Sequence, residues 1–135
     1  MSLQTPHEML ASDAFSTWLG VEILEVNPAK CTIKAEIREE FTNGFKVSHG
    51  GILFSLCDSA VAFAANTHDR VALSTQNSIH YVKAVKASDI ITVTAKEISR
   101  SNKLGTYLAE AFNQHNELVA YFNGSVYFTS NKHTS

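Results

Sequence analysis

The 135-residue chain is poor in the features that mark exported and membrane proteins. Its two cysteines, Cys31 and Cys57, are too few for a disulfide framework, so we expect a reduced, cytoplasmic setting. No apolar run reaches the roughly 18 residues that a membrane-spanning helix needs. The segment from Met1 to Phe15 contains no basic stretch followed by an apolar one, so we predict no signal peptide.

The chain also carries little charge, with a net charge of −2 and 18% charged residues. Nucleic-acid binding and membrane-surface binding both need dense basic faces, so we predict neither partner. The six histidines and two cysteines show no zinc-ligand spacing, which predicts no metal site. The sequence lacks the G-x-S-x-G elbow of serine hydrolases and the glycine-rich phosphate and dinucleotide motifs, so it does not predict those chemistries.

What is present is a chain that is 44% hydrophobic and long enough to form one domain over residues 1–135. The pattern predicts a helix over residues 6–18, ended by Gly20, and a second helix over residues 52–66. Period-two alternation and strand-like composition predict strands over residues 21–26, 31–38, 71–85, 91–96, 104–113 and 118–128. We therefore expect an α+β fold whose last strands form an antiparallel meander.

The helix over residues 52–66 is apolar nearly all round, which indicates a buried position. We expect a curved antiparallel sheet to wrap around it. The last strand is apolar on both faces, with Phe122 and Val126 on one and Val119 and Tyr127 on the other. This pattern predicts that a partner subunit covers the outer face of the sheet.

Asp58 is the one acidic residue in this apolar helix. Burying an unpaired carboxylate is costly, so its presence needs a reason. It is either a general base or nucleophile, or a structural aspartate bonded to a backbone group or to a basic residue of a neighbouring chain. The neighbouring Cys57 is a second candidate nucleophile, although a buried cysteine more often packs as a small hydrophobe.

The segment Ser48-His49-Gly50-Gly51 begins the same helix. Ser48 can cap the helix, whose first N–H groups have no partner within it. With the helix dipole, the N–H at Gly50 can polarise a carbonyl, and the glycine at Gly51 lets a ligand approach closely. The alternative is that the two glycines only permit a tight turn into the helix.

Gly50 and Asp58 are eight positions apart, which is about 12 Å along a helix. One reacting carbonyl cannot contact both. If both act, they belong to different subunits whose helices pack antiparallel. We therefore expect a composite site in which Gly50 of one chain faces Asp58 of the other.

Other residues are candidates for contacting a substrate. The amide of Asn43 can hold a water or a carbonyl, although Asn43-Gly44 is also a turn sequence. Arg100 and Lys103 flank a predicted hairpin turn and can meet phosphates, although solvated surface positions also explain them. Phe54 and Tyr81 are candidates for lining a pocket.

Together, these residues form the pattern N-G-x(4)-H-G-G-x(6)-D from Asn43 to Asp58. The pattern resembles the hotdog-fold acyl-CoA thioesterases, specifically their PaaI-like (phenylacetate-degradation) branch. The resemblance covers nearly the whole chain and implies the hotdog fold, in which a curved sheet wraps one long helix. Many relatives have a proline where this chain has residues 83–86 (KAVK), so this chain departs from the family in the loop next to the ligand.

The resemblance also implies roles. It makes Asp58 the general base or nucleophile and the Gly50 N–H the group that polarises the thioester carbonyl. It makes Asn43 a positioning residue, His49 a support for the loop, and Ser74 an assisting residue on the following strand. Family members form dimers with composite sites, usually paired into tetramers, and need no cofactor because coenzyme A is part of the substrate.

The sequence thus predicts hydrolysis of a small, aromatic or medium-chain acyl-CoA to the free acid and CoA. One alternative is a hotdog enoyl-CoA hydratase or dehydratase with His49 as the base. Another is a non-catalytic acyl-CoA-binding module. The acyl group stays open, and so does the choice between an Asp58 that activates water and one that attacks directly.

Overall fold

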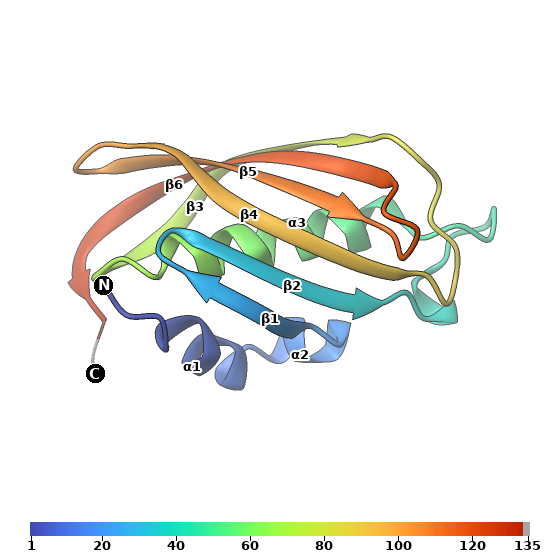
Figure 1. The fold of residues 1–135 in the computed structure, drawn as a ribbon, viewed down its shortest axis with the longest axis horizontal. Helices are drawn as coiled ribbons and strands as arrows, with labels where there is room; N and C mark the ends of the chain where they lie inside the picture. Colours follow the sequence, from blue (N-terminus) through green and yellow to red (C-terminus); the bar gives the residue numbers. More distant parts are fainter. Residues whose placement is uncertain (134–135) are drawn as a thin grey trace.

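One antiparallel sheet of six strands curves around a central helix in the computed structural model, which describes residues 1–133 (Figure 1). The α+β fold predicted from the sequence, with its sheet wrapped around one long helix, is confirmed. The elements are α1 (Thr5–Ser12), α2 (Ala14–Leu19), β1 (Glu22–Asn27), β2 (Lys30–Glu36), the short 3-10 helix η1 (Glu39–Phe41), α3 (Gly50–Ala65), β3 (Arg70–Tyr81), β4 (Ile90–Arg100), β5 (Leu104–Phe112) and β6 (Leu118–Lys132).

The strand order across the sheet is β1-β2-β4-β5-β6-β3. The predicted meander is confirmed for β4, β5 and β6, which pair in sequence order. The strand β3 instead lies at the far edge, where it pairs with β6 alone, and β2 pairs with β4. Alternation identifies a strand and its faces but not its neighbours, so the sequence did not predict this edge position.

The N-terminal segment forms two helices rather than the single predicted one. The break occurs at Asp13, whose backbone is extended. Its carboxylate accepts hydrogen bonds from the Ser16 N–H, at 2.9 Å, and from the Ser16 hydroxyl, at 2.7 Å. Aspartate is a preferred N-cap, so this side chain starts α2 instead of continuing α1.

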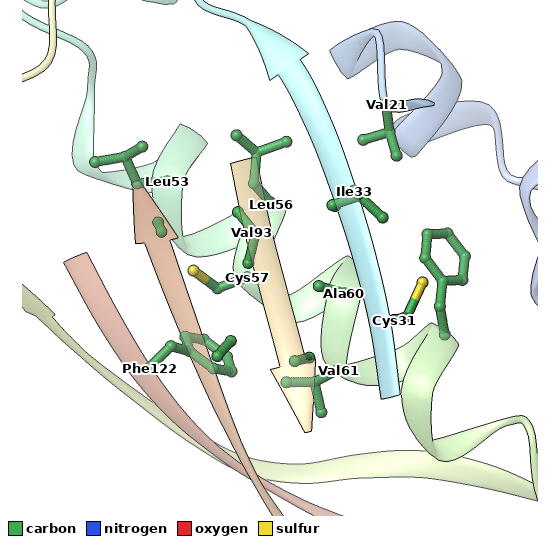
Figure 2. Close-up of a cluster of buried hydrophobic side chains, with 14 of the residues drawn as sticks. Val21, Cys31, Ile33, Leu53, Leu56, Cys57, Ala60, Val61, Val93 and Phe122 are labelled. Atoms are coloured by element: carbon green, nitrogen blue, oxygen red, sulfur yellow. The ribbon is translucent and has the colours of Figure 1, made fainter. Parts of the chain in front are cut away.

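The core lies between α3 and the concave face of the sheet. Figure 2 shows Leu56 and Ala60 of α3 in one cluster with Ile33 of β2 and Val93 of β4. These side chains are at most 1% exposed. Close packing on several strands fixes how α3 is rotated against the sheet, and therefore which of its residues face away.

The opposite face of α3 is open in this chain. Gly51, Ser55, Asp58 and Ala62 follow one another at helical spacing, and each is exposed or half-buried. The predicted burial of this helix is confirmed for the face that packs on the sheet, whereas Asp58 is half-buried in the single chain and not buried as expected. We call these four residues the open stripe of α3.

Asn66 joins the end of α3 to the start of β3 and is 2% exposed. Its amide Nδ2 donates to the carbonyls of Ala62, at 2.8 Å, and Ala72, at 3.2 Å. Its Oδ1 accepts from the Ala72 N–H at 2.9 Å. One buried side chain thus fixes the position of β3 along α3.

We predict that Asn66→Ala lowers the free energy of unfolding by about 2–4 kcal/mol, because it leaves the buried N–H and carbonyl of Ala72 without their side-chain partner, whereas the Ala62 carbonyl keeps the Asn66 backbone N–H. Denaturant titration measures the change. Asn131→Ala, at an exposed position of β6, is the matched control and should change stability by less than about 0.5 kcal/mol. Equal effects of the two substitutions would contradict this account of Asn66.

Candidate active site

The start of α3 is capped by His49, not by Ser48 as we expected. The His49 backbone is extended (φ −58°, ψ 136°), and its Nδ1 accepts a hydrogen bond from the Gly51 N–H at 2.9 Å. The Ser48 hydroxyl instead donates to the His49 carbonyl at 3.3 Å. The imidazole ring can do this because it reaches two residues forward to the second helical N–H.

The N–H of Gly50 is left free in this first turn. A helix leaves four N–H groups without internal partners, which here belong to residues 49–52. The His49 N–H donates to the Phe41 carbonyl at 2.8 Å, and the Ile52 N–H donates to the His49 carbonyl at 3.0 Å. With Gly51 bonded to the cap, the Gly50 N–H is the one that finds no acceptor among residues 1–133. It is available to a ligand carbonyl at the positive end of the helix dipole.

Tyr81 closes one side of Gly50. Its hydroxyl donates to the Gly50 carbonyl at 2.8 Å, and a Cβ at Gly50 would lie 2.8 Å from the same oxygen. A side chain at this position would therefore push against Tyr81. Partial burial raises the pKa of Tyr81, so its hydroxyl stays protonated and keeps donating.

Asp58 lies about two turns further along the open stripe and faces β3. Its Oδ1 accepts from the Ser74 hydroxyl and from the Asn77 amide Nδ2, both at 3.2 Å. Its Oδ2 has no hydrogen-bond donor within the described part of the chain. The carboxylate is half-buried, and its hydrogen bonds within the described chain come from two side chains and not from a backbone group.

The structure brings Ser74 to Asp58 and Tyr81 to Gly50, but it does not bring these two pairs together within one chain. The two ends of the arrangement stay two helical turns apart on α3. Sequence reasoning missed Asn77. A carboxamide on a predicted strand that follows an apolar helix with one aspartate is too common a pattern to single out.

The remaining predicted residues lie in simpler surroundings. Asn43 forms a turn, because its Oδ1 accepts from the Phe45 N–H at 2.9 Å. Phe54 packs edge-on against Phe122, with ring centroids 5.2 Å apart. Arg100 and Lys103 flank the β4–β5 turn, at the end of the sheet opposite the start of α3 (Figure 1).

Two shallow grooves, each of about 320 Å³, adjoin the helix start. The first is lined by Gly50, Tyr81 and the segment 82–85. The second runs past Gly51 and Ser55 to the exposed rings of Phe15 and Trp18. A long ligand whose carbonyl sits at Gly50 therefore has mainly apolar surface on both sides.

Cys57, the other candidate nucleophile, points into the core and is fully buried. Burial, and secondarily the charge of Asp58, raise the pKa of its thiol to about 12. It is therefore protonated at neutral pH and unsuited to attack. Within residues 1–133 there is also no cluster of side chains that could hold a metal ion, and no helix there is long and apolar enough to cross a membrane.

Comparison with known proteins defines the class. Residues 45–120 match the thioesterase superfamily. A putative esterase of Archaeoglobus fulgidus is 38% identical over 119 residues, which cover 88% of this chain and 77% of that protein. The acyl-coenzyme A thioesterase PaaI of Escherichia coli is 31% identical over 121 residues, which cover 90% of this chain and 86% of that protein.

The solved structure of the E. coli PaaI protein superposes with a TM-score of 0.93 at 29% identity, covering 98% of this chain and all of that one. The chain therefore belongs to the thioesterase superfamily and is one of its PaaI-like hotdog hydrolases. The hotdog fold and the hydrolase class predicted from the sequence are confirmed.

We predict that iodoacetamide at about pH 8 leaves both thiols of the native protein unmodified, because burial also raises the pKa of Cys31 to about 12. Both should be alkylated once guanidinium unfolds the chain. Mass spectrometry counts the adducts. Rapid labelling of Cys57 in the native protein would show that its thiol is reactive, and Cys57 would again be a candidate nucleophile.

Proposed function

We propose that the protein hydrolyses an acyl-CoA thioester to the free acid and CoA. The observation that carries this proposal is the presence, on one helix, of the Gly50 N–H and of the Asp58 Oδ2, neither of which has a hydrogen-bond partner among residues 1–133. The first can polarise a carbonyl, and the second can supply a base or a nucleophile. The E. coli relative named as an acyl-coenzyme A thioesterase supports CoA as the thiol.

The chemistry follows from these two groups. The thioester oxygen accepts a hydrogen bond from the Gly50 N–H, whose strength grows as negative charge develops on that oxygen. Asp58 either takes a proton from a water that attacks the carbonyl carbon, or attacks it directly to form a mixed anhydride that water then cleaves. In both routes the C–S bond breaks and the sulfur leaves as the CoA thiolate.

A dimer is needed to bring the two groups together, and β3 offers the means. It is a 12-residue strand with one unpaired edge, and Leu73 and Tyr81 on it are 58% and 53% exposed. Such an edge pairs readily with a second strand. A second copy of this chain, related by a two-fold axis, supplies a matching antiparallel edge.

The register of that pairing follows from contacts within the chain. Tyr81 is level with Gly50, and the segment 74–77 is level with Asp58. Suppose that two β3 edges pair antiparallel with Ser78 at the centre. Gly50 of one subunit then lies at the same height along the interface as Asp58 of the partner subunit. The same axis passes near Phe54 of α3, so the two open stripes face each other and cover one another.

The other predicted residues take supporting roles in this proposal. His49 holds the glycine turn through its cap, and Asn43 shapes the preceding loop. Ser74 holds the carboxylate. Because the helices run antiparallel, the β4–β5 turn of the partner, with its copies of Arg100 and Lys103, lies toward the Gly50 end, where CoA phosphates would leave the site.

We also propose that two such dimers pair through the outer face of the sheet. Leu73, Tyr127 and Leu104 stand directly opposite one another on neighbouring strands, at 58%, 41% and 54% exposure. An exposed apolar row of this kind is more typical of an interface than of a free surface. Analytical ultracentrifugation distinguishes dimer from tetramer.

We predict that Asp58→Asn lowers kcat for acyl-CoA hydrolysis by about 100- to 10,000-fold, the usual contribution of a positioned base, while acyl-CoA binding and thermal stability are retained. Release of free thiol from aryl-, short- and medium-chain acyl-CoAs measures the rate and identifies the preferred acyl group. The parental rate in this variant would refute the role of Asp58. Binding without thiol release in the parent would indicate a binding module, and hydration of enoyl-CoA a hydratase.

We predict that Gly50→Pro abolishes most activity, and that co-expression with Asp58→Asn restores about a quarter of the parental rate. Proline is favoured at the first helical position and the extended His49 backbone suits a following proline, so the substitution keeps the helix start while it removes the free N–H and adds a Cβ beside Tyr81. Half of the mixed population is heterodimer, in which one of two composite sites is intact. A site contained in one chain would give no recovery.

Gly50→Ala is the matched control for this experiment. It adds the Cβ that meets the Tyr81 hydroxyl but keeps the N–H. A much larger loss with proline than with alanine assigns the effect to the N–H. Equal losses would assign it to crowding against Tyr81.

A further inference from the structure

We propose that Asn77 is a positioning residue that holds the Asp58 carboxylate in one orientation, with Oδ1 tied down and Oδ2 free to react. The inference builds on the proposed function. It concerns a residue that lies outside the sequence pattern from Asn43 to Asp58 and that contacts the Asp58 carboxylate.

The hydrogen bonds at Asp58 are one-sided. Ser74 and Asn77 both donate to Oδ1, at 3.2 Å each, and no donor from residues 1–133 reaches Oδ2. A carboxylate held by two donors on one oxygen cannot rotate without losing both. Its second oxygen therefore points in a fixed direction, as a base or nucleophile requires.

The orientation of the Asn77 amide is settled by the same contact. If the amide were reversed, its Oδ1 would face the Asp58 carboxylate, and two acceptors would repel one another. In the present orientation the Asn77 Oδ1 is buried and has no hydrogen-bond partner in the described chain. An unpaired buried acceptor is costly. The hydrogen bond from the Asn77 amide to Asp58 therefore maintains this orientation, because the Asn77 Oδ1 forms no hydrogen bond that could do so.

The neighbouring strand leaves space for this unpaired oxygen. Asn77 is opposite Gly124 of β6, and a Cβ at Gly124 would lie 2.9 Å from the Asn77 Oδ1. Any larger residue there would press the amide out of place. The absence of a side chain at Gly124 thus permits the geometry at Asp58 without any contact with the substrate.

A bulge in β3 puts both donors on one face. Ser74 and Asn77 are three positions apart, so a regular strand would point them to opposite faces. The pairing of β3 with β6 shifts register between Ser74 and Gln76. The extra residue that β3 contains between Ser74 and Gln76 turns Asn77 toward α3, and bulges near functional sites commonly redirect side chains in this way.

The test compares Asn77→Ala with Asn77 intact, in the parental chain and in the Asp58→Asn background. In the parent we expect kcat to fall about tenfold and KM to change less than about twofold, because Asn77 acts through Asp58 and not on bound substrate. In Asp58→Asn we expect Asn77→Ala to cause no further loss, because the group it positions is gone. Asn131→Ala, at an exposed position of β6 outside the proposed β3 pairing, should leave both constants unchanged.

Loss of the same size in both backgrounds, or a change confined to KM, would overturn the proposal. A readout independent of activity separates it from the proposed function. In NMR spectra the side-chain amide signal of Asn77, assigned by its absence from Asn77→Ala, should shift in Asp58→Asn. If that signal does not move, the contact is wrong. If it moves but the parent releases no thiol, the contact stands, the proposed function fails, and the positioning role of Asn77 is overturned with it.

Discussion

The rigidity of α3 is the constraint on which the candidate site depends. A helix rises about 1.5 Å per residue, and nothing can shorten the distance between its first turn and a side chain two turns later. The free N–H of Gly50 and the carboxylate of Asp58 are therefore held apart by the element that carries them. A reaction that uses both must take one group from each of two helices, so the requirement for a second chain is geometric.

Histidine and glycine have different roles in the first turn of α3. The imidazole of His49 satisfies the N–H of Gly51, which leaves the preceding N–H as the one without an acceptor in the described chain. The missing side chain at Gly50 makes room for Tyr81, whose hydroxyl bonds the Gly50 carbonyl. The peptide groups flanking Gly50 are thus oriented from both sides before any ligand arrives, which is the preorganisation that stabilising a developing charge requires.

Much of this architecture follows from local sequence. Period-two alternation identified the strands, and the apolar run after the glycine pair identified α3, because each depends on nearby residues alone. The edge position of β3 depends on pairing between distant segments, which local patterns do not encode. The prediction of a single N-terminal helix was wrong at Asp13, because the Asp13 side chain caps a new helix and the weak apolar periodicity of this segment does not show that break. Asn77 was missed for a related reason, since the bulge that turns it toward Asp58 appears only once β3 is laid against β6.

The long unpaired edge of β3 has a second consequence, which concerns solubility. A strand of this length presents a row of unsatisfied backbone groups that can template pairing with any extended chain, including a partly unfolded copy. The edge carries few of the charges or prolines that protect such strands, since Arg70 is the one acidic or basic residue within Arg70–Tyr81 besides the histidine at position 80. In the proposed dimer this edge pairs with a second copy of the chain. A substitution that weakens the proposed pairing would therefore also expose an aggregation-prone edge.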